Sequence, residues 1–169
     1  SSSQAMDQWG RIHYDSYGST EKRILPRNNS YGDYVQNYPD LFTAYLLQVR
    51  GSNQNVNLLG ANMSRARLMG ALLINANLTE VNLKGANLSG AYLSGANLNG
   101  ANLRETNLNG ANLREADLTT VDLTGKDLRG TILVRANLLE ANLEGVDLSN
   151  KDLTGANLRG ANLTKANLT

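Results

Sequence analysis

Leucine returns at every fifth position from residue 58 to residue 168. These 23 positions hold leucine 22 times, and Met63 is the exception. The residue two places before each of these positions is alanine 15 times and valine four times. The residue directly before each of them is asparagine 14 times and aspartate five times. Glycine is the commonest residue two places after the leucine. The unit therefore runs small, polar, large apolar, variable and turn-forming.

A period of five fits neither a helix nor a flat strand. On an α-helix, each repeat turns the chain by about 500°, so the leucines would spread over every face. In a flat strand, an odd period would send successive leucines to opposite faces. A chain that bends once per repeat returns every leucine to one interior, and Asn and Gly favour such bends. The pattern predicts an all-β solenoid over 56–169 with the central leucines inside.

Ala-Asn-Leu-x-Gly units such as Ala86–Gly90, Ala96–Gly100 and Ala156–Gly160 resemble the pentapeptide-repeat family. The resemblance implies a right-handed quadrilateral parallel β-helix with four pentapeptides in each coil. It also implies that the leucine and the small residue point inward. Such proteins are abundant in cyanobacteria, and most lack a known activity.

Two lysines occupy the inward position where the repeat usually has alanine. Lys126 and Lys151 stand five repeats apart, as do Thr106 and Thr131, which indicates duplication of a five-repeat block. With four repeats to a coil, each lysine stacks one coil above a threonine. A buried ammonium is costly unless it reaches an oxygen or water. The lysines mark either an ion or ligand site or, as we favour, local accommodation at a widened corner.

The chain before residue 56 lacks the repeat. Residues 1–38 are predicted to form an extended or flexible arm, because the segment is rich in Ser, Asn, Gly and Tyr without periodicity. Residues 39–51 are predicted to form a capping helix over the first coil, with Asp40 near its start and Gly51 at its end. The alternative is a helix that binds a membrane surface or a partner. Its apolar residues recur at helical spacing: Leu41, Phe42, Tyr45, Leu46 and Val49.

Few residues offer catalytic or metal-binding chemistry. The chain has no cysteine and one histidine, His13, which with Asp15 is interpreted as part of a solvated loop. Asp127 and Asp147 are one coil apart, but a calcium site between them is disfavoured against turn-forming roles. We predict no catalytic residue, no cofactor and no metal.

The outward position departs from Asn or Asp at four places only, and three of them are apolar. Leu72, Tyr92 and Ile132 are separated by whole numbers of coils, so they fall on one side of a four-sided solenoid. Ile74 and Val134 join the same side. An exposed apolar strip is typical of an interface, and these five residues form the candidate interaction face. The alternative is that the aromatic N-terminal arm covers them.

Charge narrows the choice of function. The net charge is +1, with eleven basic and ten acidic residues in 56–169. Some pentapeptide-repeat proteins inhibit topoisomerases by mimicking DNA, which needs a strongly acidic surface, so this alternative is disfavoured. We predict a non-enzymatic rigid scaffold for an unidentified protein partner, without nucleic acid and without a membrane span. The chain would act in the cytoplasm, which is favoured, or in a periplasm or lumen reached through a removed signal peptide.

The repeat continues unbroken to the last residue. An open final coil would leave its leucines poorly covered. Either two copies form a homodimer through their C-terminal coils, as related proteins stack and as we favour, or the sequence is a module cut from a longer chain. The leucines concerned are Leu148 and Leu153, followed by the predicted end contact of Leu158, Leu163 and Leu168.

Overall fold

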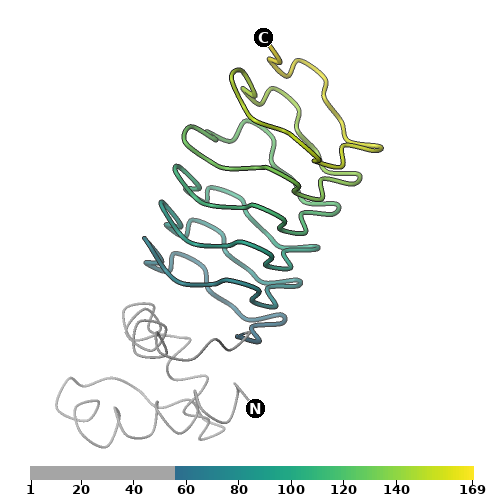
Figure 1. Ribbon diagram of the computed structural model, residues 1–169. Coiled ribbons are helices and arrows are strands. Elements are labelled where there is room, and N and C mark those ends of the chain that lie inside the picture. The colour runs from purple at the N-terminus through teal and green to yellow at the C-terminus, as the bar shows by residue number, and fades with distance from the viewer. Residues whose placement is uncertain (1–55) are drawn as a thin grey trace, which may run out of the picture.

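The computed structural model describes residues 56–169. They form coils stacked one above another along a single axis (Figure 1). Parallel bridges join outward residues of every fourth repeat, from Asn57 with Asn77 to Asp147 with Asn167. Since four pentapeptides separate the bridged residues, each coil has four sides, as the register predicted. The predicted arm over 1–38 and the predicted capping helix over 39–51 lie outside the described residues, as does His13.

Each side of a coil contributes only one bridge residue. Residues 56–169 contain no helix and no strand longer than that single residue. The bridge residue is the outward one, just before the leucine, and the turn that follows uses the rest of the repeat. The predicted parallel pairing is confirmed, but the β-structure consists of isolated bridges because the chain bends again so soon.

A tight turn forms each corner. The N–H of the first residue of a repeat donates to the preceding leucine carbonyl, as from Ala61 to Leu58 at 3.0 Å. Every fifth-position residue from Gly60 to Lys165 has a positive φ, between 53° and 70°. A positive φ at the third residue of a four-residue turn is typical of type II. This conformation costs a residue with a side chain about 1–2 kcal/mol, which explains why glycine is commonest there.

The outward asparagine stabilises both the turn and the stack. Its Oδ1 accepts the N–H two residues later, as Asn97 does from Asn99 at 3.0 Å. Its Nδ2 can donate to the residue one coil below, as Asn77 does to Oδ1 of Asn57 at 3.0 Å. Aspartate accepts the first bond but cannot donate the second.

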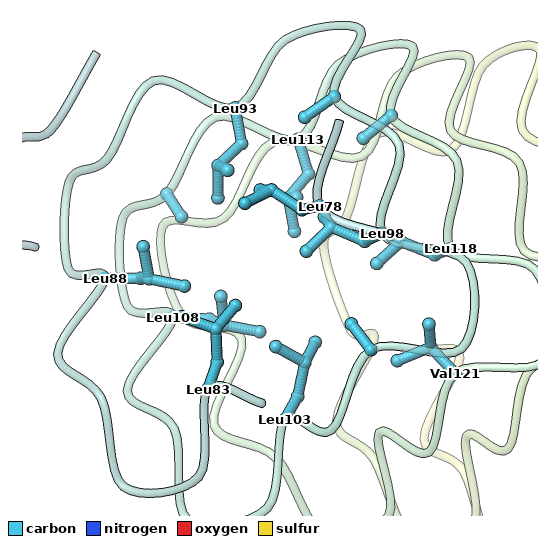
Figure 2. Close-up of a cluster of buried hydrophobic side chains, with 14 of the residues drawn as sticks. Leu78, Leu83, Leu88, Leu93, Leu98, Leu103, Leu108, Leu113, Leu118 and Val121 are labelled. Atoms are coloured by element: carbon cyan, nitrogen blue, oxygen red, sulfur yellow. The ribbon is translucent and has the colours of Figure 1, made fainter. Parts of the chain in front are cut away.

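The interior is a closed stack of leucines. Figure 2 shows Leu83, Leu88, Leu93 and Leu98 pointing from four successive sides into one core. All central residues from Leu58 to Leu148 are buried. The inward first residue of each repeat from Val56 to Val146 is buried as well, except for Lys126. The sequence prediction of a leucine interior is confirmed over this range.

Leu103→Ala should lower the free energy of unfolding by about 2–5 kcal/mol, because the closed interior leaves a cavity where the side chain was. Leu103 is 1% exposed, whereas Met69, whose side chain faces solvent, is 71% exposed. Met69→Ala is therefore the matched control and should change stability by less than about 0.5 kcal/mol. Urea denaturation measures both. Equal effects of the two substitutions would contradict an inward leucine.

Candidate functional site

The predicted interaction face forms one column of the coil. Bridges join Leu72 to Tyr92, Tyr92 to Asn112 and Asn112 to Ile132. Tyr92 is 48% exposed and Ile132 is 43% exposed, while Leu72 is half-buried. Since Asn112 interrupts the column, the face consists of two parts. The lower patch comprises Leu72, Ile74 and Tyr92, and the upper patch comprises Ile132 and Val134.

The ladder of parallel bridges that joins neighbouring coils is interrupted near the upper patch. Four bridges that the four-repeat register calls for are missing, namely 102–122, 107–127, 127–147 and 132–152. In all four pairs the upper residue is an aspartate. Of the outward residues from Asn57 to Asn167, only Asp127 and Asp152 form no bridge at all. Each of these two directly follows an inward lysine.

The lysine ammonium groups replace the lost backbone donors. Lys126 Nζ donates to the Thr106 carbonyl at 3.2 Å, and Lys151 Nζ donates to the Thr131 carbonyl at 3.3 Å. In a regular coil such a carbonyl accepts from the backbone N–H of the outward residue one coil above, as Val56 does from Asn77 at 2.8 Å. The carbonyls of Thr106 and Thr131 would otherwise pair with the N–H groups of Asp127 and Asp152.

The two threonines below the lysines are buried polar residues that make their own bonds. The Thr106 hydroxyl donates to the Leu83 carbonyl at 2.8 Å, and the Thr131 hydroxyl donates to the Leu108 carbonyl at 3.1 Å. The threonine and lysine contacts thus occur twice, five repeats apart. This repetition follows the block duplication in the sequence, so the interruption is a repeated feature of the fold.

Burial and hydrogen bonds shift the pKa values of the charged groups around the interruption. Burial lowers the pKa of Lys126, while the carboxylates of Asp122 and Glu105 act against that change. The Arg129 side chain, followed by its backbone N–H, lowers the pKa of Asp127 to about 2. The pKa of Asp147 is lowered by hydrogen bonds from Ser149, and the pKa of Asp152 by hydrogen bonds from Thr154. These carboxylates are therefore negative at neutral pH.

Two hollows flank the interrupted segment. One has a volume of about 910 Å³ and lies between 125–134 and 145–152, where it contacts both lysines and the upper patch. A second, of about 430 Å³, lies on the other side, toward 105–109. Both hollows are lined by Gly125, Lys126, Asp127 and Arg129. Two segments of the chain border the larger hollow: a lower rung, residues 126–130, and an upper rung, residues 147–149. We call the larger hollow together with these two rungs the coil gap.

The two aspartates considered for a calcium site, Asp127 and Asp147, are engaged in other bonds. In 56–169 no group of three or more His, Cys, Asp or Glu side chains is placed to hold a metal ion. Asp127 is hydrogen-bonded to Arg129 Nη2 at 2.6 Å, and Asp147 accepts a hydrogen bond from Asn167 at 3.1 Å.

Within residues 56–169, no helix has the length and apolar character that a membrane crossing needs.

The last coil exposes part of its interior. Leu158 and Leu163 are half-buried, and Leu168 is 59% exposed. Leu148, which we expected among the poorly covered leucines, is only 2% exposed. That expectation was wrong because the final coil covers Leu148, with Asp147 bridged to Asn167.

The chain is similar to known repeat proteins. A family model described as pentapeptide repeats matches the chain in eight copies, at 54–85, 86–125, 112–150, 122–160 and 136–169. No match to a curated protein was found.

Among solved structures, HetL, a pentapeptide repeat protein involved in heterocyst differentiation regulation in Nostoc sp. strain PCC 7120, is 33% identical with a TM-score of 0.41. The match covers 68% of this chain and 60% of HetL, so the chain spans less than two thirds of that protein. Rfr23 of Cyanothece 51142 is 29% identical over 76% of this chain and 94% of Rfr23, with a TM-score of 0.36. A protein of the Arabidopsis thaliana thylakoid lumen is 32% identical over 67% of this chain and 68% of its own, with a TM-score of 0.25.

Replacing both lysines with the usual alanine should stabilise the protein. In Lys126→Ala/Lys151→Ala the coils can approach, and the N–H groups of Asp127 and Asp152 can pair with the carbonyls of Thr106 and Thr131. We expect a gain of about 1 kcal/mol or more in the free energy of unfolding, measured by urea denaturation.

Lys126→Met/Lys151→Met is the matched control, because methionine keeps most of the side-chain length without the ammonium group. It should lose about 1–3 kcal/mol, since the two threonine carbonyls lose their donors. A methionine variant more stable than the alanine variant would show that the ammonium bonds do not substitute for the ladder.

Proposed function

This chain belongs to the pentapeptide-repeat family, and we propose that its β-helix is a non-enzymatic scaffold that presents one side to a protein partner. The exposed lower patch is the observation that carries the proposal. Leu72 and Tyr92 stand on adjacent rungs, and Ile74 beside them is 49% exposed. Exposed apolar side chains grouped on one side of a protein favour an interface, and tyrosine is enriched at such surfaces.

The fold itself gives no reason for apolar residues in this column. An outward asparagine bonds to its own turn, as Asn87 does through its Oδ1 with the N–H of Ser89 at 3.0 Å. Leu72 and Tyr92 have no side-chain group that replaces this acceptor for the corresponding turns. Each such bond contributes about 0.5–1.5 kcal/mol. Because the substitutions forgo that contribution, a role outside the fold explains them better than stability does.

The alternative function, inhibition of a topoisomerase by DNA mimicry, fits the charges poorly. Residues 56–169 hold eleven basic and ten acidic side chains, whereas a DNA mimic needs an excess of negative charge. Ion pairs between coils further offset the carboxylates, including Arg135 with Glu115 at 3.2 Å and Lys165 with Glu144 at 3.5 Å. A DNA supercoiling assay with a purified topoisomerase separates the two functions, because a scaffold of this charge should leave the enzyme rate unchanged.

Tyr92→Glu should abolish capture of the partner, because it places a charge at the centre of the lower patch. Affinity capture from the native extract, quantified by mass spectrometry, should show a loss of at least about tenfold for the specific partner. Met69→Glu is the matched control, since Met69 is 71% exposed but lies outside the face. A partner that binds wild type and Tyr92→Glu equally would contradict an interface at this patch.

A homodimer through the last coil is a second proposal for this chain. Leu158 and Leu163 are half-buried and Leu168 is 59% exposed, so pairing two such coils would bury apolar surface. Sedimentation over a range of concentrations should show a dimer that Leu163→Glu dissociates. Leu59→Glu, at a residue 57% exposed in the first coil, should leave the dimer intact. A wild-type monomer at high concentration would rule the dimer out.

A further inference from the structure

The coil gap exposes backbone groups that the ladder pairs elsewhere. In the pentapeptide 136–140, the Leu138 N–H donates to the Asn157 carbonyl at 2.8 Å and the Glu140 N–H donates to the Arg159 carbonyl at 2.9 Å. The equivalent bonds from Leu128 and Gly130 to the rung above are not formed within the described residues. The N–H of Asp147 likewise makes no bond to the Lys126 carbonyl below it.

Two rungs thus face each other with unpaired groups of both kinds. The lower rung offers the N–H groups of Leu128 and Gly130 and the carbonyl of Lys126. The upper rung offers the N–H of Asp147 and the carbonyls of Asp147 and Ser149. Along the lower rung one acceptor is followed by two donors, and along the upper rung one donor is followed by two acceptors. Unpaired backbone groups of both kinds on the edge of a β-sheet are a template for another strand.

We propose that the coil gap binds an extended peptide segment of a partner protein, whose main chain pairs with the facing rungs. The ligand must offer a donor and acceptors to the lower rung and an acceptor and donors to the upper rung, and the backbone of an extended peptide carries both kinds of group on both of its sides. A metal ion could bind the carbonyls but would leave the facing N–H groups without an acceptor. A nucleic acid is disfavoured because the hollow has no excess of positive charge: Lys126, Arg129 and Lys151 are balanced by Asp127, Asp147 and Asp152. The proposal shares with the proposed function the assumption of a protein partner. It concerns the coil gap and the upper patch, whereas the proposed function rests on the lower patch.

The side chains around the gap predict which peptide fits. Asp147 and Asp152 line the hollow as ionised carboxylates without an ion pair among the described residues, whereas Asp127 is already paired with Arg129. The ammonium groups of Lys126 and Lys151 are bonded to threonine carbonyls, and Lys151 acts on Asp147 only as a nearby charge. Ile132 and Val134, the upper patch, line the same hollow. A basic residue beside an apolar residue would therefore complement the gap, with the basic side chain toward the carboxylates.

The two lysines act as positioning residues for this site. A lysine side chain is much longer than the alanine that the inward position usually holds, so it keeps the coils from closing. The Lys151 ammonium group occupies the carbonyl of Thr131, which lines the gap, and the Lys126 ammonium group occupies the carbonyl of Thr106, which lines the smaller hollow below. Each bond removes an acceptor that would draw the ladder together. Lys126→Ala/Lys151→Ala should consequently close the gap while leaving the lower patch unchanged.

Selection of random decapeptides displayed on phage, with the full chain as target, tests the proposal directly. The selected peptides should carry lysine or arginine next to an apolar residue. The best of them, synthesised and measured by isothermal titration, should bind with a Kd below about 100 µM. Binding to Lys126→Ala/Lys151→Ala should be at least about tenfold weaker, and binding to Tyr92→Glu should match wild type.

Charge reversal provides a second variant that keeps the lysines in place. Asp147→Lys/Asp152→Lys should weaken the basic peptide at least about tenfold and strengthen the same peptide with glutamate in place of its basic residue. The proposal is overturned if no peptide is selected, or if the selected peptides bind wild type and the alanine variant within about twofold. It is also overturned if Tyr92→Glu alone removes binding, because the peptide would then sit on the lower patch. Loss of the natural partner in Tyr92→Glu, with peptide binding intact, would support both proposals separately.

Discussion

Burial of one leucine in every pentapeptide holds the coils of this protein together. Each side of a coil has a single bridge residue, and such a short pairing cannot hold two segments together by itself. A fully buried leucine contributes about 1.5–3 kcal/mol relative to an exposed one, and each pentapeptide supplies one. The chain must therefore bend after every leucine, which requires a positive φ at each fifth residue. The outward asparagines then stabilise those turns and tie neighbouring coils together.

The same leucine burial explains how a protein without long loops in its repeats can carry a recognition site. At Lys126 and Lys151 the ladder opens, yet the leucines nearby, Leu123 and Leu128, remain buried. The interior thus keeps its packing while the backbone between coils gives way. A site made in this manner is held by a rigid frame, and its hydrogen-bonding groups come from the main chain of the frame itself.

The sequence predicted the parts of the structure that follow from the period. The four-repeat register placed Leu72, Tyr92 and Ile132 in one column and set each lysine above a threonine. It also placed Asn112 in that column, and the structure has Asn112 between Tyr92 and Ile132, where it divides the face into two patches. It missed the opened ladder, because an inward lysine can either turn outward from a closed coil or hold the coils apart. Only the bonds of Lys126 to Thr106 and of Lys151 to Thr131 distinguish the two cases.

Residue-resolved amide hydrogen exchange in the wild-type chain tests most directly whether a closed leucine interior coexists with an open ladder. We expect slow exchange at Leu138, Glu140 and Asn157, whose N–H groups pair between coils at 2.8–3.0 Å. We expect exchange faster by about two orders of magnitude or more at Leu128, Gly130 and Asp147, which face the coil gap unpaired. Equal protection in the two groups would mean that the ladder is continuous, and it would contradict the account.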